Sequence, residues 1–195
     1  MELVLVRHGL PIRREVAEGP ADPELSVEGH DQSARLAKYL ATESIDAIYS
    51  SPMKRAMQTA EPLAKTINLP ISVIDDVAEF DRLSNEYIPI EELRAANDDR
   101  WHKLVAGEWD SESDTLDEFR SRVVTSIEKL IALHPSQRIV ITCHGGVINQ
   151  YLAHILGLET ERGFFYPQYT SIHRVIAAQN GLRSIASLNE IAHLR

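Results

Sequence analysis

Short apolar segments alternate with helical patterns along most of this chain, and this alternation is what most constrains its fold. Four segments have the length and composition of buried strands, namely residues 3–6, 47–50, 71–74 and 138–143. Because parallel strands need long crossover connections, usually helices, we expect a three-layer α/β/α sandwich with a mostly parallel central sheet and helices on both faces. Asn180-Gly181 separates two further apolar segments and predicts a hairpin near the end.

Local signals set the expected helix boundaries. Ser51 and Pro52 predict the start of the helix after the second strand, because serine caps helices and proline fits the first helical position. Pro62 lies inside this helix and is expected to kink or interrupt it, since proline lacks an N–H. Thr115 and Glu118 form a capping-box pattern at the start of a later helix.

Composition limits the size, location and partners of the protein. Its 195 residues suit one domain, 1–195, with an irregular polar segment at 80–113. The net charge of −9 leaves no basic surplus for nucleic-acid binding, and no apolar run reaches the length of a membrane span. The single cysteine, Cys143, cannot form an internal disulfide, which fits a reducing, cytoplasmic setting. The sequence does not fix the oligomeric state and is compatible with a homodimer.

Polar residues follow each of the four predicted strands at the point where the strand ends. They are Arg7 and His8; Ser50, Ser51 and Arg55; Asp75, Asp76 and Glu79; and His144, Gly145 and Gly146. Ligands of open parallel sheets bind outside the carboxyl ends of the strands. We therefore expect all four groups to lie along one edge of the sheet.

The residue types in these groups suit a doubly charged oxyanion such as phosphate. Arg7 and Arg55 offer planar forks of donors, and the helix that starts near Gly145 adds backbone N–H groups. A neutral imidazole is a competent nucleophile near pH 7. Since neighbouring positive charges disfavour protonation, we predict that His8 is neutral and that His144 is more often the cation.

Four sequence blocks follow one another in a defined order along the chain. They are "LVRHG" at 5–9, "LSVEG" with Gln32 at 25–32, "YSSPMKRAMQTA" at 49–60 and "CHGGVI" at 143–148. Together they resemble the histidine phosphatase superfamily, in its phosphoglycerate-mutase-like branch, over nearly the whole chain. The resemblance implies that fold, a small phosphorylated metabolite as substrate, no metal or other cofactor, and a lid at 80–113 that shapes substrate choice.

The resemblance also implies a role for each matched residue. His8 would attack phosphorus and become a phosphohistidine. Arg7, Arg55 and His144 would hold the equatorial oxygens of the phosphoryl group. Glu79 would protonate the departing alcohol and later deprotonate the attacking water.

The chain departs from the family pattern directly after the nucleophile. Gly9 is expected to add a backbone contact at the phosphate site that orients the His8 ring. Leu10 and Pro11 then stand where relatives carry polar residues. Arg13 or Arg14 is a candidate to compensate for the missing polar contacts.

Several alternatives stay open. The continuation after Glu79 is unlike the family's, so Asp81 or Asp76 is an alternative acid. A mutase that returns the phosphoryl group to an organic hydroxyl, or a weakly catalytic phospholigand-binding or regulatory protein, are alternatives to the phosphatase. A cysteine-dependent phosphatase is excluded, because the arginine that it needs after Cys143 is replaced by Asn149.

Overall fold

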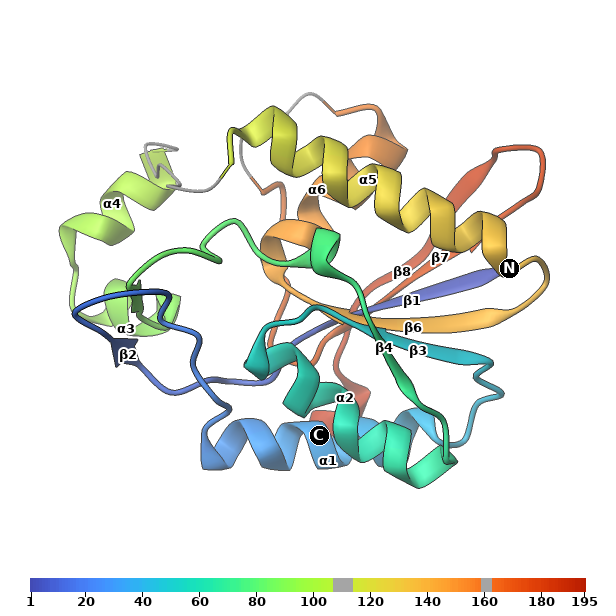
Figure 1. Ribbon diagram of the computed structural model, residues 1–195, viewed down its shortest axis with the longest axis horizontal. Helices are drawn as coiled ribbons and strands as arrows, with labels where there is room; N and C mark the ends of the chain where they lie inside the picture. Colours follow the sequence, from blue (N-terminus) through green and yellow to red (C-terminus); the bar gives the residue numbers. More distant parts are fainter. Residues whose placement is uncertain (107–113, 159–162) are drawn as a thin grey trace.

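Six strands form the central sheet of this computed structural model, which describes residues 1–106, 114–158 and 163–195 (Figure 1). The strands are β1 (Glu2–Arg7), β3 (Ala47–Ser50), β4 (Ile71–Val73), β6 (Arg138–Cys143), β7 (Ile172–Ala177) and β8 (Arg183–Glu190). Their order across the sheet is β4-β3-β6-β1-β7-β8. The first four strands in that order run parallel to one another. Strand β7 pairs antiparallel with β1, and β8 pairs antiparallel with β7. The predicted mostly parallel sheet and its terminal hairpin are confirmed.

Helices cover both faces of the sheet (Figure 1). They are α1 (Val27–Leu40) and α2 (Lys54–Ile67) on one face and α5 (Leu116–Leu133) and α6 (Gly145–Leu156) on the other. Strand β1 shows why residues 3–6 are all apolar: Val4 and Val6 pack in the cluster with α1 and α2. Leu3 and Leu5 pack in the cluster with α5 and α6. Because successive side chains of a strand point to opposite faces, this sheet buries both sets, as the three-layer prediction requires.

Helix α5 begins where the sequence predicts. The Glu118 N–H donates to Thr115 Oγ1 at 3.3 Å, and the Thr115 N–H donates to Glu118 Oε2 at 2.8 Å, which confirms the capping box. Phe119, Val123 and Ile127 lie on the buried face of the helix.

No helix within the described parts of the chain is long and apolar enough to cross a membrane.

Helix α2 begins at Lys54, so the predicted start at Ser51 is wrong. The Asp22 carboxylate accepts the Lys54 N–H at 3.1 and 3.2 Å, and it thereby caps the helix from the loop before α1. Ser51 contacts the side chain of His144 instead, in the site described below. The helix continues through Pro62 to Ile67, so the proline does not end it.

A second, two-stranded sheet lies beyond the ends of the parallel strands (Figure 1). In it β2 (Arg14–Glu15) pairs antiparallel with β5 (Glu86–Tyr87). The short helices α3 (Ile90–Ala95) and α4 (Asp99–Ala106) follow β5. Strand β5 and helices α3 and α4 lie in the segment 80–113 that is predicted to form a lid, and residues 107–113 of that segment lie outside the described residues.

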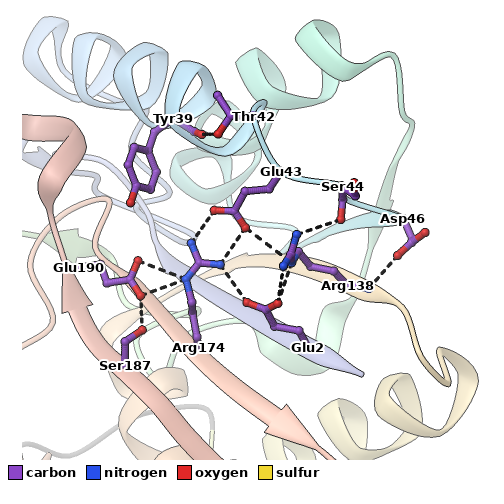
Figure 2. A network of polar contacts seen from close by, with 10 residues as sticks. All are labelled: Glu2, Tyr39, Thr42, Glu43, Ser44, Asp46, Arg138, Arg174, Ser187 and Glu190. Carbon is purple, nitrogen blue, oxygen red and sulfur yellow. Dashed lines mark hydrogen bonds and ion pairs between the residues drawn. The ribbon is translucent and has the colours of Figure 1, made fainter.

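An ion-pair network ties the sheet together at the opposite end, where β1 and β6 begin (Figure 2). Arg174 contacts Glu2 at 2.9 Å, Glu43 at 2.6 Å and Glu190 at 3.0 Å. Arg138 shares Glu2 at 2.7 Å. Burial raises the pKa of Glu2, but hydrogen bonds from Arg174 and Arg138 outweigh it and lower that pKa below its ordinary value. The network therefore stabilises the fold most when Glu2 is ionised.

Replacing Arg174 by Met should lower the free energy of unfolding by about 1–2 kcal/mol at pH 7, because three half-buried carboxylates lose a shared partner. The wild type should lose the contribution of Glu2 as the pH falls below about 4.5, since a carboxylate with a lowered pKa stabilises the folded state only while ionised. Urea unfolding between pH 3 and 7 measures both effects. Arg35→Met, which removes an exposed ion pair with Asp31, is the control; equal losses in the two variants would contradict the assignment.

Candidate active site

The ends of three parallel strands bring the predicted site residues together. Arg7 of β1 lies opposite Cys143 of β6, and Ser50 of β3 lies opposite Thr142. The residues that follow these strands therefore leave the sheet side by side. As a result the rings of His8 and His144 lie 5.2 Å apart, centroid to centroid.

His8 is buried and its ring orientation is fixed by its neighbour. Its Nδ1 lies 2.8 Å from the carbonyl oxygen of Gly9. Because a carbonyl only accepts, Nδ1 carries the hydrogen and the lone pair is on Nε2. Burial lowers the pKa of His8 well below its ordinary value, and the positive charges of Arg55 and Arg7 lower it further. The prediction of a neutral His8 is confirmed.

His144 is neutral as well, so the prediction that it carries the charge is wrong. Burial lowers its pKa well below the ordinary value, and the positive charges of Arg55 and Arg7 lower it further. Its Nε2 lies 2.7 Å from Ser51 Oγ, while its Nδ1 is buried and has no hydrogen-bond partner among the described residues. When the Ser51 hydroxyl donates to Nε2, Nδ1 carries a hydrogen that can be donated to a bound oxygen.

Two buried arginines supply the positive charge of the site. Arg55, at the start of α2, is 1% exposed and pairs through Nη2 with Asp81 at 2.9 Å, while its Nε and Nη1 have no partner among the described residues. Arg7 donates through Nη1 to the carbonyl of Pro167 at 2.6 Å, and its Nε is also unpartnered. Buried polar atoms are rarely left unpaired. These donors, with Nδ1 of His144, therefore fit the oxygens of a phosphoryl group.

Glu79 reaches the same edge from the loop after β4. Its Oε2 accepts the Gly146 N–H at 2.8 Å and its Oε1 accepts its neighbour Phe80's N–H at 3.0 Å. Burial raises the pKa of Glu79 and the negative charge of Asp81 raises it further, against the opposite effect of the two backbone hydrogen bonds and Arg55. A carboxyl with a raised pKa is suited to giving and taking a proton.

The alternative acids have other positions. The Asp81 carboxylate is the partner of Arg55. Asp76 is exposed, and its carbonyl oxygen accepts from Arg122. The geometry therefore favours Glu79 over both. No group of three or more His, Cys, Asp or Glu side chains in the described ranges is arranged to hold a metal ion.

The backbone of the segment after His8 is held by α1 and α2. The Gly9 N–H donates to Thr59 Oγ1 at 2.9 Å, so Gly9 contributes to the site through its carbonyl on His8. Leu10 donates its N–H to Gln32 at 2.9 Å and accepts from Ser26. Leu10 is thus held by backbone contacts at the start of α1.

Aromatic rings surround the arginines, and no sequence motif predicts them. The Arg7 guanidinium carbon lies 4.0 Å from the ring centroid of Tyr169 and 5.2 Å from that of Tyr166. Arg55 lies 4.6 Å from the ring centroid of Tyr87 in β5. These tyrosines are far from the four blocks along the chain, and no motif marks them. Cation–π contacts of this kind hold a guanidinium in place without neutralising it.

A sequence profile described as the histidine phosphatase superfamily (branch 1) matches residues 3–191. The chain belongs to this superfamily. It is 30% identical over 159 residues to an uncharacterized phosphatase, PhoE, of Bacillus subtilis, covering 80% of this chain and 78% of the relative. It is 27% identical over 201 residues to phosphoserine phosphatase 1 of Hydrogenobacter thermophilus, covering 100% and 94%.

Solved structures of histidine phosphatases have the same fold. A mutant phosphoserine phosphatase from Entamoeba histolytica in complex with phosphoserine superposes with a TM-score of 0.77 and 25% identity, covering 100% of this chain and 99% of that one. The predicted family and the phosphoglycerate-mutase-like fold are therefore confirmed.

Gly146 gives a direct test of the Glu79 position. A Cβ at residue 146 would lie 2.3 Å from Glu79 Oε1, whereas a Cβ at residue 145 would meet nothing closer than Arg7 Nε at 3.8 Å. Gly146→Ala should therefore displace the Glu79 carboxyl and lower phosphatase kcat by about tenfold or more. Gly145→Ala should have a smaller effect, although both variants gain similar helix propensity. Steady-state kinetics and melting temperatures compare them, and equal losses would contradict the assigned contact.

Proposed function

We propose that this histidine phosphatase hydrolyses small phosphate monoesters without a metal ion, through a phosphohistidine on His8. The observation that carries the proposal is the set of buried, unpartnered donors on Arg7, Arg55 and His144 beside a neutral imidazole whose Nε2 carries the lone pair. The donors match the oxygens of a phosphoryl group, and the lone pair supplies the nucleophile.

In the first step the Nε2 lone pair of His8 attacks phosphorus and the bond between phosphorus and the ester oxygen breaks. Glu79 gives its proton to the departing oxygen, so the alcohol leaves neutral. In the second step water attacks phosphorus, Glu79 takes a proton from that water, and the P–N bond breaks. Phosphate is released, and His8 and Glu79 return to their starting protonation states.

The cationic donors stabilise the charge that spreads over the equatorial oxygens in both steps. They are already desolvated and fixed by Asp81, Pro167 and the tyrosine rings, so they need little reorganisation when charge develops. A phosphate dianion bound between them would also favour protonation of His144, which is neutral without that charge. His144 would then bind the phosphoryl group first as a neutral hydrogen-bond donor and, once protonated, would stabilise the charge of the transition state more strongly than the neutral ring does.

The substrate is a small phosphorylated metabolite, and the segment 80–113 is the lid that selects it within a single domain, 1–195. The Entamoeba histolytica relative holds phosphoserine, which supports an ester of this size. The described part of the segment provides Tyr87 and Asp81, which contact Arg55. Changes in this segment therefore reach the phosphate site directly.

His8→Ala should lower hydrolysis of p-nitrophenyl phosphate roughly a thousandfold or more, because the variant lacks the nucleophile. Wild type exposed to radiolabelled substrate and quenched should carry an acid-labile phosphoryl group that His8→Ala lacks. His30→Ala, an exposed histidine in α1, is the control and should keep full activity. An active His8→Ala enzyme would overturn the mechanism.

A panel of phosphate esters tested on the wild type separates the alternatives. Transfer of the phosphoryl group between hydroxyls of a phosphosugar or a phosphoglycerate, in preference to release of phosphate, would identify a mutase. Phosphate binding by wild type without turnover of any ester would identify a binding or regulatory protein.

Glu79→Gln should lower kcat about a hundredfold to ten-thousandfold for alkyl phosphates, and less for p-nitrophenyl phosphate, whose leaving group needs little protonation. In wild type, kcat/KM should fall as the pH rises above the raised pKa of Glu79, because the acid must be protonated. On the acid side activity should persist below pH 6.5, since the lowered pKa of His8 keeps it neutral. The fall of kcat/KM at high pH should be missing from the pH profile of Glu79→Gln. If the fall is unchanged in this variant, it belongs to the titration of another group.

A further inference from the structure

The Arg7 side chain is held by three residues of the segment that leads into β7. The carbonyl oxygen of Pro167 accepts from Arg7 Nη1 at 2.6 Å. The ring centroids of Tyr166 and Tyr169 lie 5.2 and 4.0 Å from the guanidinium carbon. Residues 166–168 form an irregular stretch of chain, so the place of the Arg7 guanidinium depends on what fixes this stretch.

Asn189 of β8 contacts this stretch on both sides of Pro167. Its Oδ1 accepts the Gln168 N–H at 2.8 Å, and its Nδ2 donates to the Tyr166 carbonyl oxygen at 2.9 Å. The Gln168 N–H and the Pro167 carbonyl belong to the same planar peptide group, in which the two bonds point in opposite directions. By holding that N–H, Asn189 therefore fixes the direction of the carbonyl that accepts from Arg7.

An irregularity in the hairpin of β7 and β8 brings Asn189 to this position. The register of the two strands shifts there, so that Leu188 and Asn189 both lie opposite His173. Asn189 has a φ of 57°, in the left-handed region. Bulges of this kind redirect side chains, and asparagine and glycine tolerate a left-handed backbone best. Of these two residues, asparagine alone has a side chain that can make both contacts.

The backbone of Asn189 is joined to Arg7 by a second route. The Asn189 N–H donates to His173 Nδ1 at 3.2 Å, so the other ring nitrogen carries the hydrogen and donates to Ser171 Oγ at 2.9 Å. Burial, together with the positive charge of Arg7, lowers the pKa of His173 to about 4, so the ring stays neutral near pH 7. The Ser171 carbonyl in turn accepts the backbone N–H of Arg7 at 3.2 Å.

We propose that Asn189 is a positioning residue for phosphate binding, which acts through the Pro167 carbonyl to hold the Arg7 guanidinium in the site. Arg7 Nε, which has no partner among the described residues, is thereby kept in place for a phosphoryl oxygen. This inference rests on the proposed phosphatase function and adds to it a residue far from the four sequence blocks.

Asn189→Gly tests the proposal, because it removes both side-chain contacts and still allows the left-handed backbone. It should lower kcat/KM for p-nitrophenyl phosphate about tenfold and raise the Kd for inorganic phosphate about fivefold or more, since a displaced guanidinium no longer meets an oxygen. Asn68→Gly is the matched control. Asn68 has a φ of 55° and ends α2, at the opposite end of that helix from Arg55. Equal losses in the two variants would overturn the proposal.

A double-mutant cycle with Arg7→Met distinguishes positioning from a general loss of structure. In the Arg7→Met background, Asn189→Gly should change the phosphate Kd and kcat/KM by less than about twofold, because the group through which Asn189 acts is gone. The same fold-loss in both backgrounds would contradict the inference.

Asn189→Asp gives a graded test of the same contact. It keeps an oxygen that accepts the Gln168 N–H but loses the donor to Tyr166, so its phosphate Kd should fall between those of wild type and Asn189→Gly. A loss as large as that of Asn189→Gly would count against the role assigned to the Gln168 N–H. If Asn189→Gly does not fold, Asn189→Asp takes its place in the cycle.

Calorimetric phosphate affinities separate this inference from the phosphatase function, because they do not depend on turnover. If wild type binds phosphate but hydrolyses no monoester, the proposed function fails and the cycle still decides the role of Asn189. If wild type is an active phosphatase and the cycle shows no coupling to Arg7, the inference fails and the proposed function stands. A wild type that does not bind phosphate would overturn both.

Discussion

Two guanidinium groups buried beside two imidazoles are the interaction on which the rest of this site depends. Burying a charge is costly unless it is paired, and the chain pairs these charges only in part. Asp81 takes one nitrogen of Arg55, the Pro167 carbonyl takes one of Arg7, and tyrosine rings cover both planes. Nε and Nη1 of Arg55 and Nε of Arg7 have no partner among the described residues, so the fold carries an unfavourable desolvation that a phosphoryl group would relieve.

Burial decides the protonation of the histidines, and the same charges reinforce it. A pocket that holds two permanent cations cannot easily hold two more, and both His8 and His144 respond by staying neutral. A neutral imidazole of this kind is already a competent nucleophile and needs no dedicated general base. Glu79 shows the complementary effect, because burial and Asp81 favour its protonated form although Arg55 is near.

Much of the fold could be predicted because its signals are local. The apolar strands, the capping box at Thr115 and the polar residues at the strand ends all follow from neighbours in the sequence. The predictions that are wrong concern positions whose structure or charge depends on residues far away in the sequence. Asp22 caps α2 in place of Ser51, and Ser51 contacts His144 instead. The charge of His144 depends on Arg55 and Arg7 together, and the tyrosines around the arginines lie in segments that no motif connects to the site.

The depth of Arg55, with 1% of its surface exposed, has a consequence for the range over which this protein senses a ligand. The chain as a whole carries a net charge of −9, so at a distance it does not attract an anionic ester. In salt solution the field of a charge fades within about 10 Å, and a buried guanidinium adds little beyond that. The protein therefore discriminates between ligands only at contact. Water must first leave both surfaces, and each unpaired nitrogen then either forms a hydrogen bond with a ligand oxygen or remains unpaired.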